Sequence, residues 1–78
     1  MTEISEMTFG QKAVGYSFNP SGDVAVHNCK VEFAVVIDRM NSLRNNTDDE
    51  EIKRMASIAI TEAQTAQMWA VKALTWRG

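Results

Sequence analysis

The sequence predicts an all-α protein: an antiparallel helical hairpin domain, residues 21–78, preceded by an irregular N-terminal arm, residues 1–20. Two long segments with apolar residues at helical spacing predict helices near 22–44 and 48–76. A short polar segment that contains Asn45 and Asn46 separates them, and a connection this short makes neighbouring helices antiparallel. The predicted fold class therefore depends on two segments with helical periodicity and on the short turn between them.

The arm differs in composition from the rest of the chain. It holds two of the four glycines and the only proline, and its apolar residues follow no sustained period. Asn19 precedes Pro20, and a residue in that position is disfavoured in helical dihedral angles. We therefore expect an extended or irregular segment that turns into the first helix.

The first helix is predicted to begin after Ser21, a residue type that caps helix N-termini, and to end near Arg44. Asp23 then lies in the first turn, where a negative charge favours the helix dipole. Spacings of three and four place one continuous apolar stripe on this helix: Val26, Cys29, Phe33, Val36, Met40 and Leu43. This stripe is expected to face the second helix.

The second helix begins with the pattern Thr47-Asp48-Asp49-Glu50, which is typical of a capping box. No glycine or proline interrupts residues 48–77. Small residues recur at the same spacings of three and four: Ala56, Ala59, Ala63, Ala66, Ala70 and Ala73. Large side chains of one helix packed against alanines of the other allow a close antiparallel approach.

Many large apolar residues lie off these two faces. They are Val31, Val35, Ile37, Ile52, Met55, Ile58, Ile60, Met68, Trp69, Val71, Leu74 and Trp76. A two-helix monomer has a single inner face, whereas each buried side chain of this kind stabilises by about 1.5–3 kcal/mol. We therefore expect a homo-oligomer in which copies of the chain cover one another.

Composition excludes several function classes. Eight Lys and Arg against ten Asp and Glu give a formal charge of −2, which argues against binding DNA. One Cys and one His are too few for a structural zinc site, so we expect no metal or cofactor. No apolar run approaches a membrane span and the N-terminus is acidic, which predicts a cytoplasmic protein without membrane contact. No catalytic constellation is visible, so we do not expect an enzyme.

Three residues form a candidate binding site. Tyr16 stands in the arm after Gly15, where it need not belong to the core, and an exposed aromatic can stack on a nucleobase. Lys30 lies just off the apolar stripe on the side of His27 and can meet a phosphate. The alternative stays open that Tyr16 packs over the hairpin, that Lys30 is solvated and that His27 is a surface residue. Cys29 is expected to be a core residue.

Two passages resemble a known family. The run 66–73, Ala-Gln-Met-Trp-Ala-Val-Lys-Ala, and the pair Gly15-Tyr16 followed by residues 26–30 are similar to sequences of the small phage anti-CBASS sponge proteins. These share a helical hairpin domain with the anti-Thoeris sponges, and the likeness covers roughly residues 15–76. The family sequesters cyclic oligonucleotide second messengers that bacterial defence systems make on infection.

The resemblance implies a homohexamer of interlocked hairpins that acts in the host cytoplasm. Cyclic dinucleotides such as cyclic GMP–AMP would bind uncleaved between subunits near the arms, with Tyr16 on a base, Lys30 on phosphates and His27 beside them. Some members also hold cyclic trinucleotides at separate threefold sites. Here the candidates for such a site are Arg54, Ser57 and Thr61, which share one helix face.

Two other classes of function remain as alternatives. A helical interaction module would inhibit a host protein through an exposed apolar helix face, as a monomer or dimer. An enzyme that degrades the messenger is the third possibility, and it would release a linear product.

Overall fold

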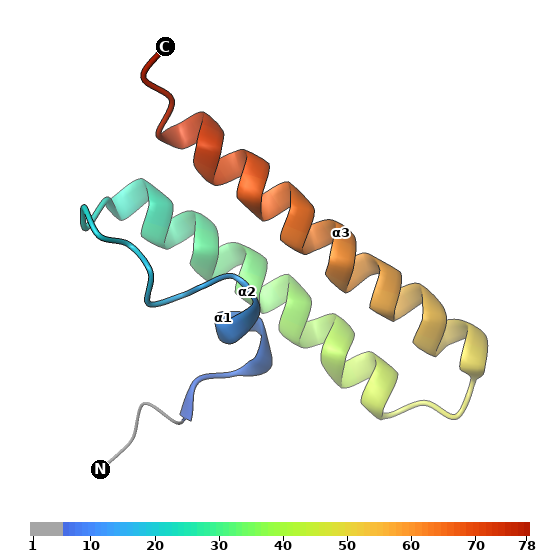
Figure 1. Ribbon diagram of the computed structural model, residues 1–78. Coiled ribbons are helices and arrows are strands. Elements are labelled where there is room, and N and C mark those ends of the chain that lie inside the picture. The colour runs from blue at the N-terminus through green and yellow to red at the C-terminus, as the bar shows by residue number, and fades with distance from the viewer. Residues whose placement is uncertain (1–5) are drawn as a thin grey trace.

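The computed structural model describes residues 6–78 of the chain. That part contains three helices, α1 (Phe9–Ala13), α2 (Val24–Asn45) and α3 (Glu50–Leu74), and no strand. Figure 1 shows α2 and α3 side by side and antiparallel, with α1 lying against α2. The predicted all-α hairpin is confirmed. Residues 1–5 of the predicted arm lie outside the described residues.

α2 begins two residues later than predicted because Asp23, not Ser21, is its N-cap. The Asp23 carboxylate accepts from the amides of Ala25 and Val26 at 2.8 and 3.2 Å. Asn19 holds this cap in place, since its side chain donates to the Asp23 carbonyl at 2.9 Å and accepts from the Asp23 amide at 3.3 Å. Both residue types cap helices well, and the Asn19 contacts select the aspartate.

α3 likewise begins at Glu50 instead of residue 48. Asp49 is its N-cap and accepts from the amides of Glu51 and Ile52 at 2.9 and 3.4 Å. The predicted capping box at Thr47 is therefore wrong. The Thr47 hydroxyl instead accepts from the Asp49 amide at 3.2 Å and so stabilises the turn before the helix.

The arm contains a short helix, which corrects the prediction of an irregular segment. A capping box opens α1, because the side chains of Thr8 and Gln11 each accept from the other residue's amide at 3.0 Å. Gly15 ends it with a φ of +66°, a value that favours glycine. The amide of Tyr16 donates to the Gln11 carbonyl at 2.9 Å and that of Gly15 to the Lys12 carbonyl at 3.2 Å, which is a Schellman motif. Tyr16 thus follows the helix end directly.

The buried face of α2 is rotated from the predicted stripe. Ile37 was expected to lie off this stripe, yet it has no exposed surface, whereas Val36 and Leu43 are exposed. The cause is the arm: Val14 is buried in the same cluster as Ala34, Ile37 and Ile60. α2 therefore packs against both the arm and α3. Its buried face is the one directed toward the space between these two neighbours.

α3 shows the same rotation. Its buried residues are Ala56, Ile60 and Gln67, whereas Ala66 and Ala73, two of the predicted contact alanines, are exposed. Within residues 6–78 the side chain of Gln67 makes no hydrogen bond, although it is only 5% exposed. The contact between the helices therefore includes a large residue and a buried amide, and it is not a row of alanines.

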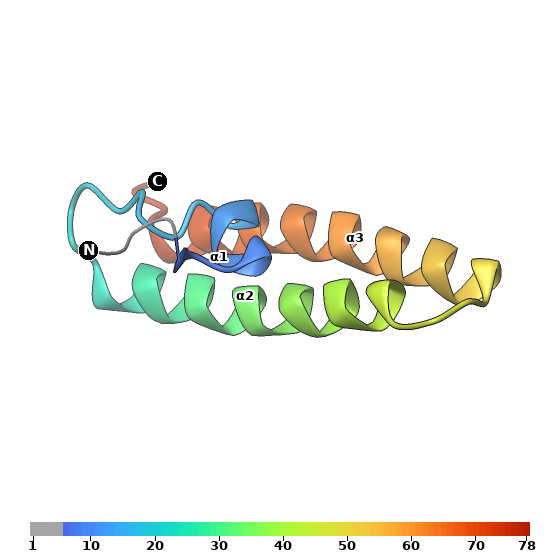
Figure 2. The same cartoon turned by 90° about the horizontal axis from the view of Figure 1, so that it is seen from below.

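The molecule is thin. Its principal extents are 44 × 38 × 12 Å, and Figure 2 shows the helices forming a shallow layer. Because one extent is only 12 Å, residues 6–78 form a single shallow layer, and large parts of its two faces stay open. Large apolar side chains remain exposed on α3 and just beyond it: Met55, Ile58, Met68, Trp69, Leu74 and Trp76. No helix among residues 6–78 is long and apolar enough to cross a membrane.

Candidate functional site

Tyr16, His27 and Lys30 come together where the arm meets the first turns of α2. The ring centroids of Tyr16 and His27 are 5.5 Å apart, with the planes tilted by 54°. The Lys30 ammonium donates to the carbonyl of Gly15, next to Tyr16, at 3.0 Å. The structure thus places Tyr16 of the arm beside His27, and Lys30, three residues further along α2, holds the peptide before Tyr16.

Tyr16 is half-buried and packs against the core cluster. This contact agrees with the alternative that Tyr16 packs over the hairpin. The side chain is not enclosed, however, and His27 beside it is exposed. The arrangement offers a partly open aromatic surface held on a rigid support, which suits the stacking of a planar ligand.

The alternative that Lys30 is solvated is wrong. It is 5% exposed, and its ammonium donates to the carbonyls of Gly15 and Phe18. These bonds use two of its three N–H donors. Within residues 6–78 no carboxylate forms an ion pair with it. A buried cation without an opposite charge is costly, and an anion bound nearby would reduce that cost.

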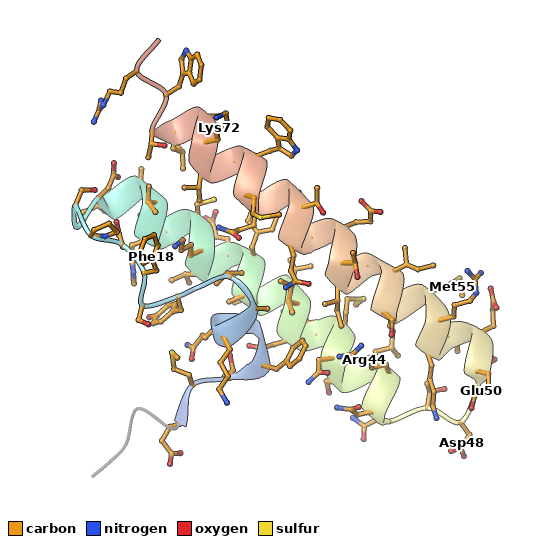
Figure 3. The ribbon with its side chains drawn as sticks, in the orientation of Figure 1. Phe18, Arg44, Asp48, Glu50, Met55 and Lys72 are labelled. Carbon is orange, nitrogen blue, oxygen red and sulfur yellow. The ribbon has the colours of Figure 1, made fainter. Side chains whose placement is uncertain are left out.

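Phe18 belongs to this location, although the sequence reasoning did not select it. Its side chain is 72% exposed and its ring centroid lies 5.5 Å from the Lys30 ammonium. Figure 3 shows Phe18 on the turn between α1 and α2. Tyr16 was selected because it is an aromatic residue of a turn segment without apolar periodicity. The same argument applies to Phe18 and would have found it.

Close backbone contact attaches the arm to the hairpin. The Gly10 amide donates to the Asp38 carboxylate at 2.7 Å, and a Cβ at Gly10 would lie 2.2 Å from the Ala34 carbonyl oxygen. From α3, the Gln64 side chain donates to the Ala13 carbonyl at 3.5 Å. The position of Tyr16 is therefore set by both long helices.

Arg54, Ser57 and Thr61 also lie together. With Ile58 and Glu62 they line an open hollow of about 320 Å³ on α3. Because α2 and α3 are antiparallel, this hollow is at the opposite end of the hairpin from the start of α2. Figure 3 shows that separation, with Phe18 near one end and Glu50 and Met55 near the other.

The polar side chains of Arg54, Ser57 and Thr61 already have partners within the chain. The Arg54 guanidinium makes two bonds to the Glu51 carboxylate, and this contact lowers the pKa of Glu51 and raises that of Arg54. Ser57 accepts from Arg44 at 3.0 Å, while Thr61 donates to the Ser57 carbonyl at 3.2 Å. An anion in the hollow would have to compete with Glu51 for the guanidinium.

Cys29 is buried on the inner part of α2, as expected for a core residue. Burial, and after it the negative charge of Glu32, raise the pKa of its thiol. Such a thiol is a poor nucleophile at neutral pH. No group of three or more His, Cys, Asp or Glu residues suited to a metal ion occurs among residues 6–78.

Comparison with known proteins decides the family. The model of the family described as Acb2/Tad1, hairpin domain, matches residues 11–75, which is most of the chain. The chain belongs to this Acb2/Tad1 family. It is the family of the anti-CBASS and anti-Thoeris sponges, so the resemblance carried by Gly15-Tyr16, residues 26–30 and residues 66–73 is confirmed. Neither a curated protein nor a solved structure matches the chain.

The match to the Acb2/Tad1 family covers the candidate site. It starts within α1, includes the turn that carries Tyr16 and Phe18, and continues through both long helices. Sponges of this family are binding proteins and not enzymes.

Proposed function

We propose that this chain is a phage sponge that binds cyclic dinucleotides such as cyclic GMP–AMP, holds them uncleaved in the host cytoplasm and thereby blocks CBASS signalling. The observation that carries the proposal is a half-buried Tyr16 that directly follows Gly15, whose carbonyl accepts from the buried Lys30 ammonium, and no carboxylate of residues 6–78 neutralises that ammonium. A nucleotide presents the matching pair, a flat base and a phosphate. Membership in the sponge family supports the same ligand class.

Each side chain has a role that its chemistry allows. Tyr16 stacks on a base, a contact worth about 1–3 kcal/mol in single-strand binders. Lys30 directs its third N–H at a phosphate in a charge-assisted bond. His27, exposed beside the Tyr16 ring, donates a ring N–H to the same phosphate or borders the base.

Self-association follows from the shape of the ligand and of the chain. A cyclic dinucleotide has two bases and two phosphates, whereas one chain offers one Tyr16 and one Lys30. Two copies facing each other supply both halves of the pocket. Trp69 is 67% exposed, and covering about 150 Å² of it would stabilise an interface by about 4 kcal/mol. We propose a homohexamer, in which each subunit covers the open faces of its neighbours.

The hollow on α3 is proposed as a second site, for cyclic trinucleotides, formed where copies of Arg54, Ser57 and Thr61 meet. A ligand phosphate there would take the Arg54 guanidinium from Glu51. The Glu51 side chain is exposed in the chain as it stands, so water can solvate its carboxylate once the guanidinium has left it.

Calorimetric titration with cyclic GMP–AMP tests the main proposal. The wild-type protein should bind it, and Tyr16→Ala should weaken binding by about five- to 150-fold per stacked base, since loss of stacking costs about 1–3 kcal/mol. Tyr16→Phe is the matched control and should bind like the wild type, because it keeps the ring. Absence of binding by the wild-type protein contradicts the proposal, and unchanged binding by Tyr16→Ala removes Tyr16 from the site.

One observation favours a second candidate, an interaction module that inhibits a host protein. Met68 and Trp69 are 62% and 67% exposed on α3 and form an apolar surface that a partner helix can cover. Sedimentation of the purified protein separates the two candidates. A monomer or dimer favours the interaction module, whereas a hexamer uses this surface for self-association.

A further inference from the structure

The Lys30 ammonium binds the arm on both sides of Tyr16. It donates to the carbonyl of Gly15, which belongs to the peptide that joins Gly15 to Tyr16, and to the carbonyl of Phe18 two residues later. The turn between these carbonyls is closed by the Phe18 amide, which donates to the Gly15 carbonyl at 2.9 Å. Lys30 therefore attaches a closed turn, with Tyr16 inside it, to α2.

Besides this attachment, Tyr16 packs against the core cluster, and the arm before it is held at Gly10 and Ala13. The Tyr16 amide bonds to the Gln11 carbonyl, which belongs to the arm itself. The contact between the Tyr16 and His27 rings reaches α2, but His27 is exposed. The Phe18 ring lies over the ammonium, so its position depends on Lys30 as well.

We propose that Lys30 is a positioning residue: by holding the Gly15–Phe18 turn, it sets the Tyr16 ring in the orientation that receives a base. This role rests on the proposed function and is additional to any bond between Lys30 and a phosphate. It explains why an ammonium that could bind a ligand is 5% exposed and already uses two donors within its own chain. Removing the ammonium would release the turn and with it the stacking surface.

Amide hydrogen exchange of the ligand-free protein tests the attachment without reference to any ligand. In Lys30→Met, which keeps the apolar stem, the Tyr16 and Phe18 amides should exchange at least about tenfold faster than in the wild type, while the α3 amides are unchanged. Lys72→Met, which removes an exposed lysine whose ammonium lies over the Trp76 ring, should leave both amides as they are. Unchanged protection of Tyr16 and Phe18 in Lys30→Met overturns the proposal.

A measurement on the wild-type protein covers the case in which Lys30→Met does not fold. A hydrogen-bonded, buried ammonium exchanges its protons slowly, so the Nζ signal of Lys30 should be visible by nitrogen-15 NMR at neutral pH when that of Lys72 is not. A Lys30 signal that is lost under the same conditions as the Lys72 signal overturns the proposal.

A double-mutant cycle links the attachment to binding of cyclic GMP–AMP. If Lys30 positions Tyr16, the fold-losses of Lys30→Met and Tyr16→Ala should not multiply, and Tyr16→Ala should cost little once Lys30 is replaced. If Lys30 only contacts a phosphate, the two fold-losses multiply, and the positioning role is wrong. If the wild-type protein binds no cyclic dinucleotide, the proposed function fails, while hydrogen exchange still decides whether Lys30 holds the turn.

Discussion

Replacement of Gly10 by alanine tests whether the arm is an integral part of the fold. The Cβ of Gly10→Ala would lie 2.2 Å from the Ala34 carbonyl oxygen and 2.9 Å from the Asp38 carboxylate carbon. An ordinary contact requires more than 3 Å, so α1 has to move away from α2 by about 1 Å. That movement stretches the bond of 2.7 Å between the Gly10 amide and Asp38 beyond hydrogen-bonding distance.

The expected cost follows from these contacts. Loss of a hydrogen bond to a charged group costs about 1.5–3 kcal/mol, and the strain of overpacking adds about 1–3 kcal/mol. Alanine is favoured over glycine within a helix by about 1 kcal/mol, which acts in the opposite direction. We therefore expect Gly10→Ala to lower the free energy of unfolding by about 1.5–5 kcal/mol.

Urea unfolding followed by circular dichroism, at a fixed protein concentration, measures this change. Lys12→Ala, at an exposed position of the same helix, serves as the control and should change stability by no more than about 0.5 kcal/mol. Because α1 positions Tyr16, Gly10→Ala should also weaken binding of cyclic GMP–AMP. A Gly10→Ala protein as stable as the wild type would refute the close contact between α1 and α2.

Three further predictions follow from single residues. Asp49→Ala removes the N-cap of α3 and should lower the free energy of unfolding by about 1 kcal/mol in urea titrations, whereas equal stability would mean that the cap contributes nothing. Gln67→Leu should raise that free energy by about 1 kcal/mol, because within residues 6–78 the buried amide is unbonded, and a loss of stability would show that it has a partner. The pKa of the Cys29 thiol is raised in the folded protein, so folding favours the protonated thiol. The resulting stabilisation is fully present below the pKa of the thiol in the unfolded chain and is lost as the pH rises through its pKa in the folded protein. The urea midpoint should therefore fall less steeply with alkaline pH in Cys29→Ala than in the wild type, and equal slopes would contradict this.

The helical hairpin was predictable because its signals are local and repeated. Apolar residues at spacings of three and four, without an intervening glycine or proline, identify long helices whatever surrounds them. The ends were predicted less well, since Ser21 and Thr47 are good caps by residue type. Asn19 selects Asp23 as the cap of α2, and Asp49, not Thr47, caps α3.

The buried faces were less predictable for a different reason. The prediction that Val36 and Leu43 are buried assumed that α2 has one neighbour. In the structure α2 packs against the arm as well as α3. Burial of Val14 in the core draws Ala34 and Ile37 inward. Because a short helix such as α1 has too few residues to show a period, its contribution could not be derived from the pattern of the long helices.

Three residues of the candidate site were selected from the sequence, but Phe18 and the arrangement of the side chains were not. Tyr16, His27 and Lys30 were selected from the sequence, and the structure places them together. Burial of Lys30 was not foreseen, because a lysine beside an apolar stripe is normally solvated. Its acceptors are backbone carbonyls of a turn, and a sequence pattern carries no information on where such carbonyls point.

Native mass spectrometry of the protein mixed with cyclic GMP–AMP tests the central claim most directly. We expect one oligomeric species, a hexamer, that carries the dinucleotide and releases it with unchanged mass when the protein is denatured. A monomer that carries no dinucleotide would contradict the account, and release of a linear product would show that the protein degrades the messenger.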